Sequence, residues 1–224
     1  MKHHIKTFLP AAGLASRMKG IPKFLLPIND KKTLLSFHLE NLLELKNNEL
    51  VIGTSNSFFK NLKDIYSDLN ISEIKSNSMV ETVIKLKLEV ERLSLVVMPD
   101  TYFSNYEIVS EMREKLSSTN LDVVLGIWEI KSKQRGKLGQ CKIEGEFITE
   151  VIDKDFNCKE EFFWGLIMWK PKFNEYISTN DPHFGVSLNR AISEKLKIGF
   201  VKGKEQYFDC GTFDEYLALV KSLK

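Results

Sequence analysis

The stretch 8-FLPAAGLASRMKGIPKFLLPI-28 decides how the rest of the chain is interpreted. It passes from an apolar run through small residues and Gly13, then places Arg17 and Lys23 close together before it becomes apolar again. Three interpretations compete: a secretion signal, a tight strand-to-helix turn with two solvated cations, and a loop whose backbone N–H groups hold phosphate. The loop has neither the Gly-Lys-Ser/Thr ending of a P-loop nor the full spacing of a dinucleotide fingerprint. By itself it therefore leaves the plain turn and the phosphate site equally open.

Composition narrows the class of protein. A chain of 224 residues with 43% hydrophobic and 28% charged residues predicts one folded domain over residues 1–224. Lys and Arg total 32 against 30 Asp and Glu, and a net charge of +2 excludes a general basic surface for nucleic acid or anionic membrane. The three cysteines, Cys141, Cys158 and Cys210, have no Cys-x-x-Cys spacing, so we expect free thiols in a reducing compartment.

A secretion signal is disfavoured because Pro10 and Gly13 interrupt a short apolar run, and no run approaches the roughly 18 apolar residues of a membrane span. We therefore expect a cytoplasmic protein. The four histidines show no metal-ligand spacing, and His38, inside a predicted helix, is expected at the surface or its boundary rather than in catalysis.

The chain alternates between strand and helix patterns. Apolar runs typical of buried strands cover residues 5–9, 49–55 and 94–100, and helical spacing covers residues 34–45, 58–69 and 78–93. This rhythm predicts an α/β fold with a Rossmann-like mixed, mainly parallel sheet flanked by helices. Ligands of such sheets bind at the carboxyl ends of the strands, where Ala11 and Asp100 both fall.

The second half has more strands in sequence. Residues 121–130 and 162–170 are predicted strands, and residues 139–155 are a predicted hairpin turning near Glu144 and Gly145, which makes a small β excursion. A helix over 186–197, two short segments over 198–203 and 205–212, and a closing helix over 213–223 complete the pattern.

The two cations and two later aspartates form a consistent chemical set. Arg17 offers forked donors for phosphate oxygens, and Lys23, presented after Pro22, offers a compact charge. Each aspartate has an ordinary alternative role, since Asp100 follows "VVMP" as a capping or turn residue does, and Asp209 stands near Gly211 as a turn carboxylate.

Three segments, "PAAGLASRM…KGIPKFLLPI", "VVMPDTYF" and "YFDCGTFDEY", resemble in order the motifs of the nucleotidyltransferases that make nucleotide sugars. The opening is most similar to the bacterial UTP:glucose-1-phosphate uridylyltransferase type. The resemblance spans most of the chain and implies that an NTP reacts with a phosphorylated acceptor and releases pyrophosphate.

The resemblance also implies residue roles. Nucleotide would lie on the backbone around Ala11, Ala12, Gly13 and Leu14, with Arg17 at the pyrophosphate end and Lys23 at the α-phosphate. Asp100 and Asp209 would hold Mg²⁺, a hard cation suited to carboxylate oxygens. The base-reading segment corresponds to "SNSMVETV", where Ser78 and Met79 replace the usual residues and leave the choice of base open.

Acceptor contacts are implied for four residues. "EVIDKD" is similar to the family's Glu-Lys-Pro segment without its proline, which gives Asp153 a sugar hydroxyl and Lys154 the acceptor phosphate. Gly139 and Gly165 would let the acceptor approach the backbone, although a glycine in a strand also marks a bulge. A solvated lysine in a charged turn is the plain alternative for Lys154.

Three other functions stay open. The chain is short for an enzyme that makes nucleotide sugars and is near the length of cytidylyltransferases that act on phosphocholine. In such an enzyme a cage for the choline cation would be formed by Trp128, Trp164 and Trp169, which otherwise would pack in the core. A nucleotide-sugar-dependent glycosyltransferase would use a carboxylate-bound cation without needing Arg17 and Lys23. An inactive nucleotide-binding scaffold would be expected to lose Lys23 or an aspartate. The sequence does not fix the oligomeric state.

Overall fold

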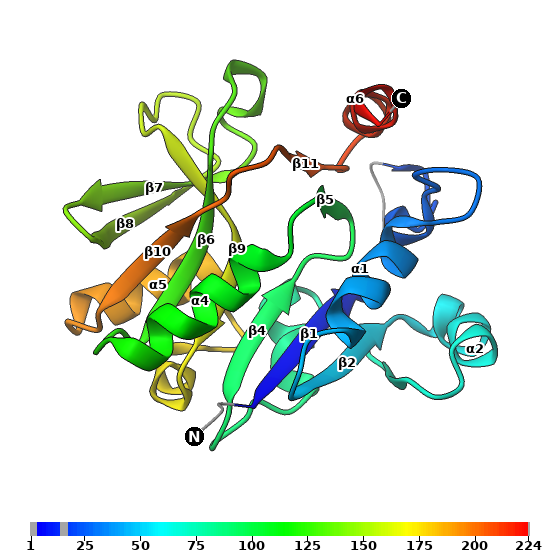
Figure 1. The fold of residues 1–224 in the computed structure, drawn as a ribbon, viewed down its shortest axis with the longest axis horizontal. Coiled ribbons are helices and arrows are strands. Elements are labelled where there is room, and N and C mark those ends of the chain that lie inside the picture. Colours follow the sequence, from blue (N-terminus) through cyan, green and yellow to red (C-terminus); the bar gives the residue numbers. More distant parts are fainter. Residues whose placement is uncertain (1–3, 14–17, 224) are drawn as a thin grey trace.

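The computed structural model describes residues 4–13 and 18–223. These residues form a nine-stranded sheet, a separate two-stranded sheet and helices on both faces of the larger sheet (Figure 1). The strands are β1 (Ile5–Ala11), β2 (Asn48–Thr54), β3 (Asn70–Glu73), β4 (Leu93–Val97), β5 (Thr101–Phe103), β6 (Val123–Glu129), β7 (Gly139–Glu144), β8 (Phe147–Asp153), β9 (Phe162–Trp169), β10 (Ile198–Lys202) and β11 (Tyr207–Asp209). The α-helices are α1 (Leu34–Leu43), α2 (Asn56–Ile65), α3 (Met79–Lys85), α4 (Glu107–Ser118), α5 (Phe184–Ser193) and α6 (Phe213–Ser222).

The larger sheet is mixed and mainly parallel, as predicted. Its main path runs β10-β6-β9-β4-β1-β2-β3. β1 pairs in parallel with both β2 and β4, whereas β9 is antiparallel to both β4 and β6. All seven residues of β1 are buried, which explains its near-continuous apolar sequence, because a central parallel strand is covered on both faces.

Two apolar cores lie on opposite faces of the sheet. Along β1, Ile5 and Leu9 belong to one core and Phe8 to the other, since successive side chains of a strand point to opposite faces. The first core includes buried residues of α1, α2 and α4, and the second includes those of α3 and α5. The helices therefore cover both faces, and they leave the strand ends open for a site.

α1 begins at a capping box. The Thr33 side chain accepts a hydrogen bond from the backbone N–H of Ser36, and the Ser36 hydroxyl accepts one from the Thr33 N–H. This reciprocal pair satisfies two N–H groups that the first helical turn leaves without partners. The cap fixes where α1 begins, immediately after the segment that carries Lys23.

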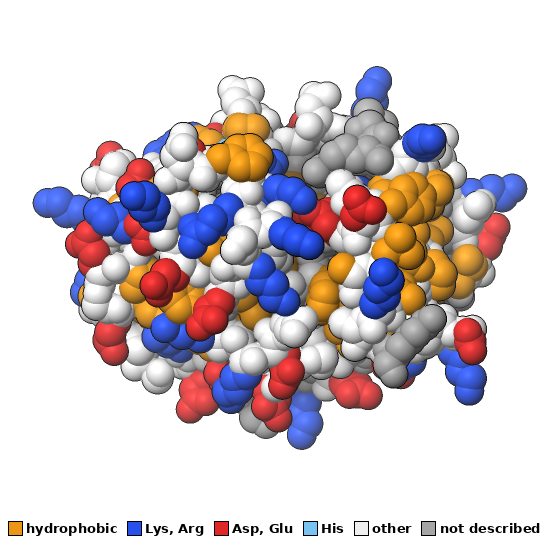
Figure 2. All heavy atoms as spheres, turned by 90° about the horizontal axis from the view of Figure 1, so that it is seen from above, with side chains coloured by type: hydrophobic (Ala, Val, Ile, Leu, Met, Phe, Trp, Pro, Cys, Tyr) orange, Lys and Arg blue, Asp and Glu red, His pale blue; other side chains and the backbone are white. Residues whose placement is uncertain are grey.

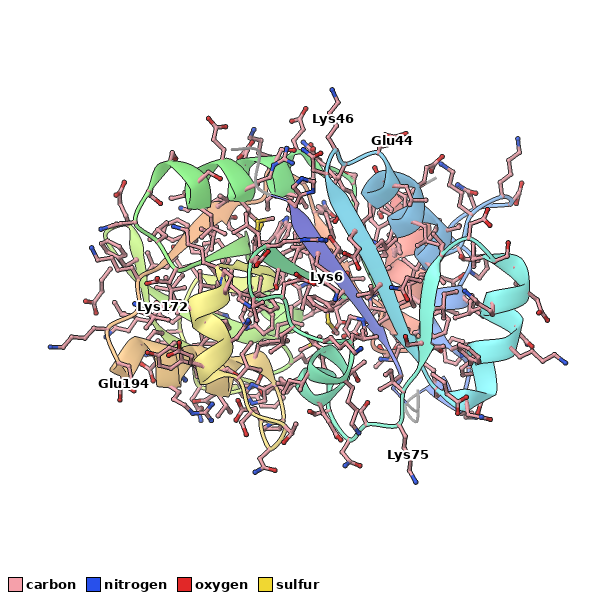
Figure 3. The ribbon with its side chains drawn as sticks, turned by 90° about the horizontal axis from the view of Figure 1, so that it is seen from below. Lys6, Glu44, Lys46, Lys75, Lys172 and Glu194 are labelled. Atoms are coloured by element: carbon pink, nitrogen blue, oxygen red, sulfur yellow. The ribbon has the colours of Figure 1, made fainter. Side chains whose placement is uncertain are left out.

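The predicted helix over residues 78–93 is wrong in its second half, because α3 ends at Lys85. Lys87 has a φ of 66°, a left-handed conformation that stops a helix. Lys6 stabilises this turn, since its Nζ donates to the Lys87 carbonyl at 2.9 Å and pairs with Glu89 at 3.2 Å. Seen from below, Lys6 lies at β1, while Lys46 and Lys75 project from the edges of the molecule (Figure 3).

The predicted β excursion is confirmed. β7 and β8 form an antiparallel hairpin off the main path, and β7 also pairs with β9. The hairpin turns at Gly145, whose φ of 61° suits glycine because it has no Cβ. The second, smaller sheet consists of β5 and β11, which lie above the strand ends together with α6 (Figure 1).

Candidate active site

A cavity of about 400 Å³ opens at the carboxyl ends of β1 and β4. Ala11 ends β1, and Asp100 lies three residues after the last residue of β4. Since the two strands are parallel neighbours, their ends meet at the same edge of the sheet. The cavity is lined by Pro10, Ala11, Ala12, Gly13, Pro22, Lys23, Phe24, Ser76, Asn77, Ser78, Met79, Thr82, Met98, Pro99 and Asp100. Among the described residues, those predicted from the first two motifs therefore share one cavity: Ala11, Ala12, Gly13, Lys23 and Asp100.

Lys23 and Asp100 form an ion pair in this cavity. The Lys23 Nζ lies 3.1 Å from the Asp100 Oδ2, and the two side chains are 14% and 21% exposed. Lys23 begins a short 3₁₀ helix, Lys23–Leu25, which follows the extended residue Pro22. The ion pair therefore joins a cation and a carboxylate that are 77 residues apart in the chain.

The small β5/β11 sheet brings Asp209 beside Asp100. Asp209 is paired with Thr101, the residue after Asp100, and the backbone N–H of Cys210 donates to the Asp100 carbonyl at 3.0 Å. The pKa of the Cys210 thiol is raised to about 12, first by burial and then by the negative charges of Asp100 and Asp209. Both carboxylates therefore act on the same buried thiol.

A third apolar cluster holds the Lys23 segment against the Asp209 strand. Met18, Leu26 and Ile28, on either side of Lys23, pack with Cys210 and with Leu219 of α6. The Tyr216 hydroxyl of α6 also donates to the Pro27 carbonyl at 2.6 Å. The cluster joins the segments that carry Lys23 and Asp209, which the sequence separates by nearly the whole chain.

Another part of the cavity wall is formed around the N-terminus of α3. Ser78 and Met79, the predicted base-reading residues, both line the cavity. The Ser78 Oγ accepts from the Glu81 N–H at 3.1 Å and donates to the Asp181 carbonyl at 2.9 Å. Ser78 therefore fixes the helix and ties this wall to the segment that precedes α5.

Two predicted residues, Leu14 and Arg17, lie outside the described residues. Ala11, Ala12 and Gly13 line the cavity directly before them. A Cβ added at Gly13 would meet no atom of the described residues within 4 Å. The described part of the loop thus leaves room for a ligand at its backbone.

Residues 8–136 match the model of the MobA-like NTP transferase domain, which is more than half of the chain. The chain belongs to this nucleotidyltransferase family. Among curated proteins, no sequence matches it significantly. Within the parts that the structure describes, no helix has the length and hydrophobicity needed to cross a membrane.

Solved structures share the fold of this nucleotidyltransferase across nearly all its length. A Bacillus anthracis protein assigned as a glucose-1-phosphate thymidylyltransferase has a TM-score of 0.83 at 15% identity, covering 98% of this chain and 95% of that one. A UDP-glucose pyrophosphorylase complexed with UDP-glucose has a TM-score of 0.75 at 18% identity, with 98% of both chains covered. An inositol-1-phosphate CTP transferase from T. maritima has a TM-score of 0.74 at 14% identity, covering 99% of this chain and 97% of that one.

The four predicted acceptor residues of the nucleotidyltransferase do not line the 400 Å³ cavity, as far as the described residues show. Gly139 begins β7 opposite Asp153, the last residue of β8. Lys154 follows with a φ of 50° and an exposed side chain. Gly165 lies within β9, where an added Cβ would come within 2.4 Å of the Tyr207 ring. Close packing of this ring is a sufficient reason for the glycine.

His183 contacts one of the predicted acceptor residues, although the sequence does not predict a role for it. Its Nε2 lies 3.3 Å from the Asp153 Oδ2, and its Nδ1 is buried without a hydrogen-bond partner among the described residues. It precedes α5 by one residue and comes two residues after Asp181, which contacts Ser78. The contact joins residues 30 positions apart, and no local sequence pattern signals it.

A second cavity, of about 770 Å³, is lined in part by Asp209. Its lining residues are Lys131, Ser132, Lys133, Gln134, Lys137, Leu138, Tyr207, Phe208, Asp209, Thr212, Asp214, Glu215 and Ala218. On the face seen from above, Lys and Arg side chains gather between hydrophobic patches (Figure 2). Since Leu138 precedes Gly139, this cavity approaches the predicted acceptor side of the nucleotidyltransferase.

His38 corrects another prediction. It is fully buried rather than at the surface or its boundary. Its Nε2 lies 2.8 Å from the Thr101 carbonyl oxygen, and its Nδ1 contacts the Tyr106 hydroxyl. Burial lowers the pKa of His38 to about 4, despite opposing effects of the Thr101 carbonyl and the Asp100 charge. The helical pattern placed His38 on α1 but could not show that partners more than 60 residues away would enclose it.

The structure tests the roles predicted for two tryptophans and for the three cysteines. Trp128 and Trp169 are buried in the two cores, and Trp169 stacks on Phe8. They pack as core residues and do not form a cation cage. All three cysteines are free thiols, as predicted.

The Asp100 and Asp209 pair fits Mg²⁺ in the nucleotidyltransferase. Mg²⁺ is commonly held by one or two carboxylates together with substrate phosphates and water. Among residues 4–13 and 18–223, no three His, Cys, Asp or Glu side chains are grouped as a complete metal site. Two hard oxygen donors, Asp100 in the 400 Å³ cavity and Asp209 joined to it through β5 and β11, suit a metal whose other ligands are phosphate oxygens and water.

Proposed function

We propose that this nucleotidyltransferase, as one domain over residues 1–224, transfers a nucleoside monophosphate from an NTP, preferentially a pyrimidine NTP, to a sugar 1-phosphate or related phosphomonoester. Pyrophosphate would be released in a Mg²⁺-dependent reaction. The observation that carries the proposal is the Lys23–Asp100 pair in a cavity at the strand ends, with Asp209 joined to it through β5 and β11.

The triphosphate would lie along the backbone of Ala11, Ala12 and Gly13. These residues combine small side chains with a position at the end of a parallel strand, where backbone N–H groups can approach an anion. Leu14 and Arg17 would continue this contact, with the Arg17 guanidinium at the pyrophosphate end. Ser78 and Met79, which line the same cavity, would contact the base.

Lys23 would stabilise negative charge at the α-phosphate while the bond to the β-phosphate breaks. The Asp100 carboxylate lies 3.1 Å from its ammonium group and would hold that cation where an entering phosphate can share it. Asp100 and Asp209 would hold Mg²⁺, which neutralises triphosphate charge and orients the reacting groups. Because the attacking acceptor phosphate is already ionised, the chain needs no general base, and positioning supplies much of the rate.

The acceptor would enter from the side of Gly139, Asp153, Lys154 and Gly165. The Asp153–His183 contact offers a carboxylate and an imidazole for hydroxyl groups, and Lys154 offers a cation for phosphate. A polyhydroxylated acceptor suits these groups better than choline, because Trp128 and Trp169 are committed to the cores. The free thiols agree with our proposal that the enzyme works in the cytoplasm.

A second candidate is cytidylyl transfer to a non-sugar phosphomonoester. The inositol-1-phosphate CTP transferase of T. maritima and this chain cover each other almost completely, at 99% and 97%. Inositol phosphate presents hydroxyl groups and a phosphate like those of a sugar phosphate, so the same residues would suit it.

The test is Mg²⁺-dependent pyrophosphate release from CTP, UTP, dTTP, ATP and GTP, each with sugar 1-phosphates, inositol 1-phosphate and phosphocholine. One productive pair would establish the reaction and both specificities. Lys23→Ala should lower kcat by at least about 100-fold, as expected for loss of a charge that acts in the transition state. Lys142→Ala is the matched control, because Lys142 forms an exposed ion pair with Glu144 on the β7–β8 hairpin. A folded protein that releases no pyrophosphate with any pair would overturn the proposal.

A further inference from the structure

His38 links α1 to the turn that carries Asp100. It is fully buried, and its Nε2 lies 2.8 Å from the Thr101 carbonyl oxygen. A carbonyl oxygen only accepts hydrogen bonds, so Nε2 carries the proton. Nδ1 is then the acceptor and receives the hydrogen bond of the Tyr106 hydroxyl. Both ring nitrogens are engaged, which fixes the tautomer and the ring orientation.

Thr101 stands between the two predicted metal carboxylates. It follows Asp100 directly and is paired with Asp209 across β5 and β11. Its hydroxyl donates to the Met98 carbonyl at 2.8 Å, which closes the turn after β4. A shift of the Thr101 backbone would therefore move Asp100, its neighbour in the chain, and Asp209, its partner in the sheet.

α1 also bounds the segment that carries Lys23. The Leu34 N–H donates to the Leu26 carbonyl at 3.0 Å, and Pro27 and Thr33 form an isolated bridge. Phe37, the neighbour of His38, packs against Tyr102 at 4.7 Å between ring centroids. One helix thus contacts both the Lys23 segment and the strand that follows Asp100.

We propose that His38 is a positioning residue that sets the spacing of Asp100 and Asp209 by holding the Thr101 carbonyl. The proposal rests on the proposed function, since those carboxylates are the proposed Mg²⁺ ligands. Burial keeps the imidazole neutral, as its lowered pKa of about 4 indicates, so it adds no positive charge beside the metal site. His38 itself contacts no substrate and takes no proton in the reaction.

The experiment compares three variants with the wild type. His38→Leu removes both hydrogen bonds, His38→Gln can donate to Thr101 and accept from Tyr106, and Leu62→Ala weakens a buried site on α2 without touching this turn. Equilibrium binding of Mn²⁺ alone is read from the EPR signal of the free ion. The Mg²⁺ concentration for half-maximal pyrophosphate release is measured in parallel.

We expect His38→Leu to weaken Mn²⁺ binding about tenfold and to raise the half-maximal Mg²⁺ concentration similarly, as is typical when a group that orients metal ligands is removed. His38→Gln should stay within about twofold of the wild type, and Leu62→Ala should not change the metal response. Unchanged Mn²⁺ binding by folded His38→Leu would overturn the inference. If that variant does not fold, Tyr106→Phe replaces it, with about threefold weaker binding expected and no change contradicting the proposal.

The two proposals fail in different ways. A wild-type protein that binds Mn²⁺ but releases no pyrophosphate contradicts the proposed reaction, while the His38 comparison still stands on metal binding. If the wild type releases pyrophosphate, and His38→Leu and His38→Gln bind Mn²⁺ equally well, only the role of His38 is contradicted.

Discussion

Lowering the pH from 7.5 to 5 is expected to destabilise the fold through His38. The pKa of this buried imidazole is lowered from 6.5 to about 4 in the folded chain, chiefly by burial. Between these values the unfolded chain binds a proton that the folded chain does not. The free energy of unfolding therefore falls as the pH falls through this range. It has its full value above the unfolded pKa of 6.5, where the imidazole is neutral in both states.

The magnitude follows from the pKa difference. The full gap between 6.5 and about 4 corresponds to about 3 kcal/mol, of which about 2 kcal/mol is lost by pH 5. His38 is fully buried, so solvent does not reduce this effect. The expected loss is a large part of the roughly 5–15 kcal/mol that stabilises a typical folded protein.

Urea unfolding from pH 7.5 to 5, in EDTA to remove divalent ions, measures the effect. His38→Gln is the matched variant, because it keeps hydrogen bonds to Thr101 and Tyr106 without an ionisable ring. Its free energy of unfolding should fall about 2 kcal/mol less than that of the wild type over this range. Equal slopes for the two proteins, or an NMR titration of the His38 ring near pH 6.5, would refute the reasoning.

Three further predictions concern buried groups. Gly165→Ala should destabilise the protein by about 1–3 kcal/mol in urea unfolding, because the added Cβ would come within 2.4 Å of the Tyr207 ring; no loss would show that β9 can shift freely. Asp181→Asn should cost about 1–2 kcal/mol at pH 7, a figure reduced by the exposure of its partner Arg190. Because the Arg190 hydrogen bond lowers the pKa of Asp181, the difference from wild type should shrink as the pH falls below about 4, and a constant difference would argue against this pairing. Cys210 should resist alkylation by iodoacetamide at pH 8, since burial raises the pKa of its thiol to about 12; mass spectrometry showing rapid labelling of the folded protein would contradict this.

The strand ends and the cavity could be predicted because their signals are local. Apolar runs and the helical spacing between them predict parallel strands, and parallel neighbours bring residues such as Ala11 and Asp100 to one edge. The resemblance of three motifs to the nucleotidyltransferases then implied that Lys23 and Asp100 belong to the same site. The structure places them 3.1 Å apart.

The rest depends on contacts between distant residues. β5 and β11 have three residues each, too few for a periodic pattern, yet their pairing brings Asp209 to Asp100. The helical spacing around His38 is typical of a surface position. Only the folded chain brings Thr101 and Tyr106 into contact with its ring. α3 ends early because Lys87 adopts a left-handed conformation, which the alternating apolar and charged sequence around it does not signal.

The most direct test of the central claim follows the phosphorus atoms of the NTP. With a productive NTP and acceptor, label placed in the α-phosphate should appear in the acceptor product, and label in the γ-phosphate should appear in pyrophosphate. Transfer of the γ-label to the acceptor, or retention of the α-label in a free nucleotide, would contradict nucleotidyl transfer at the Lys23–Asp100 site.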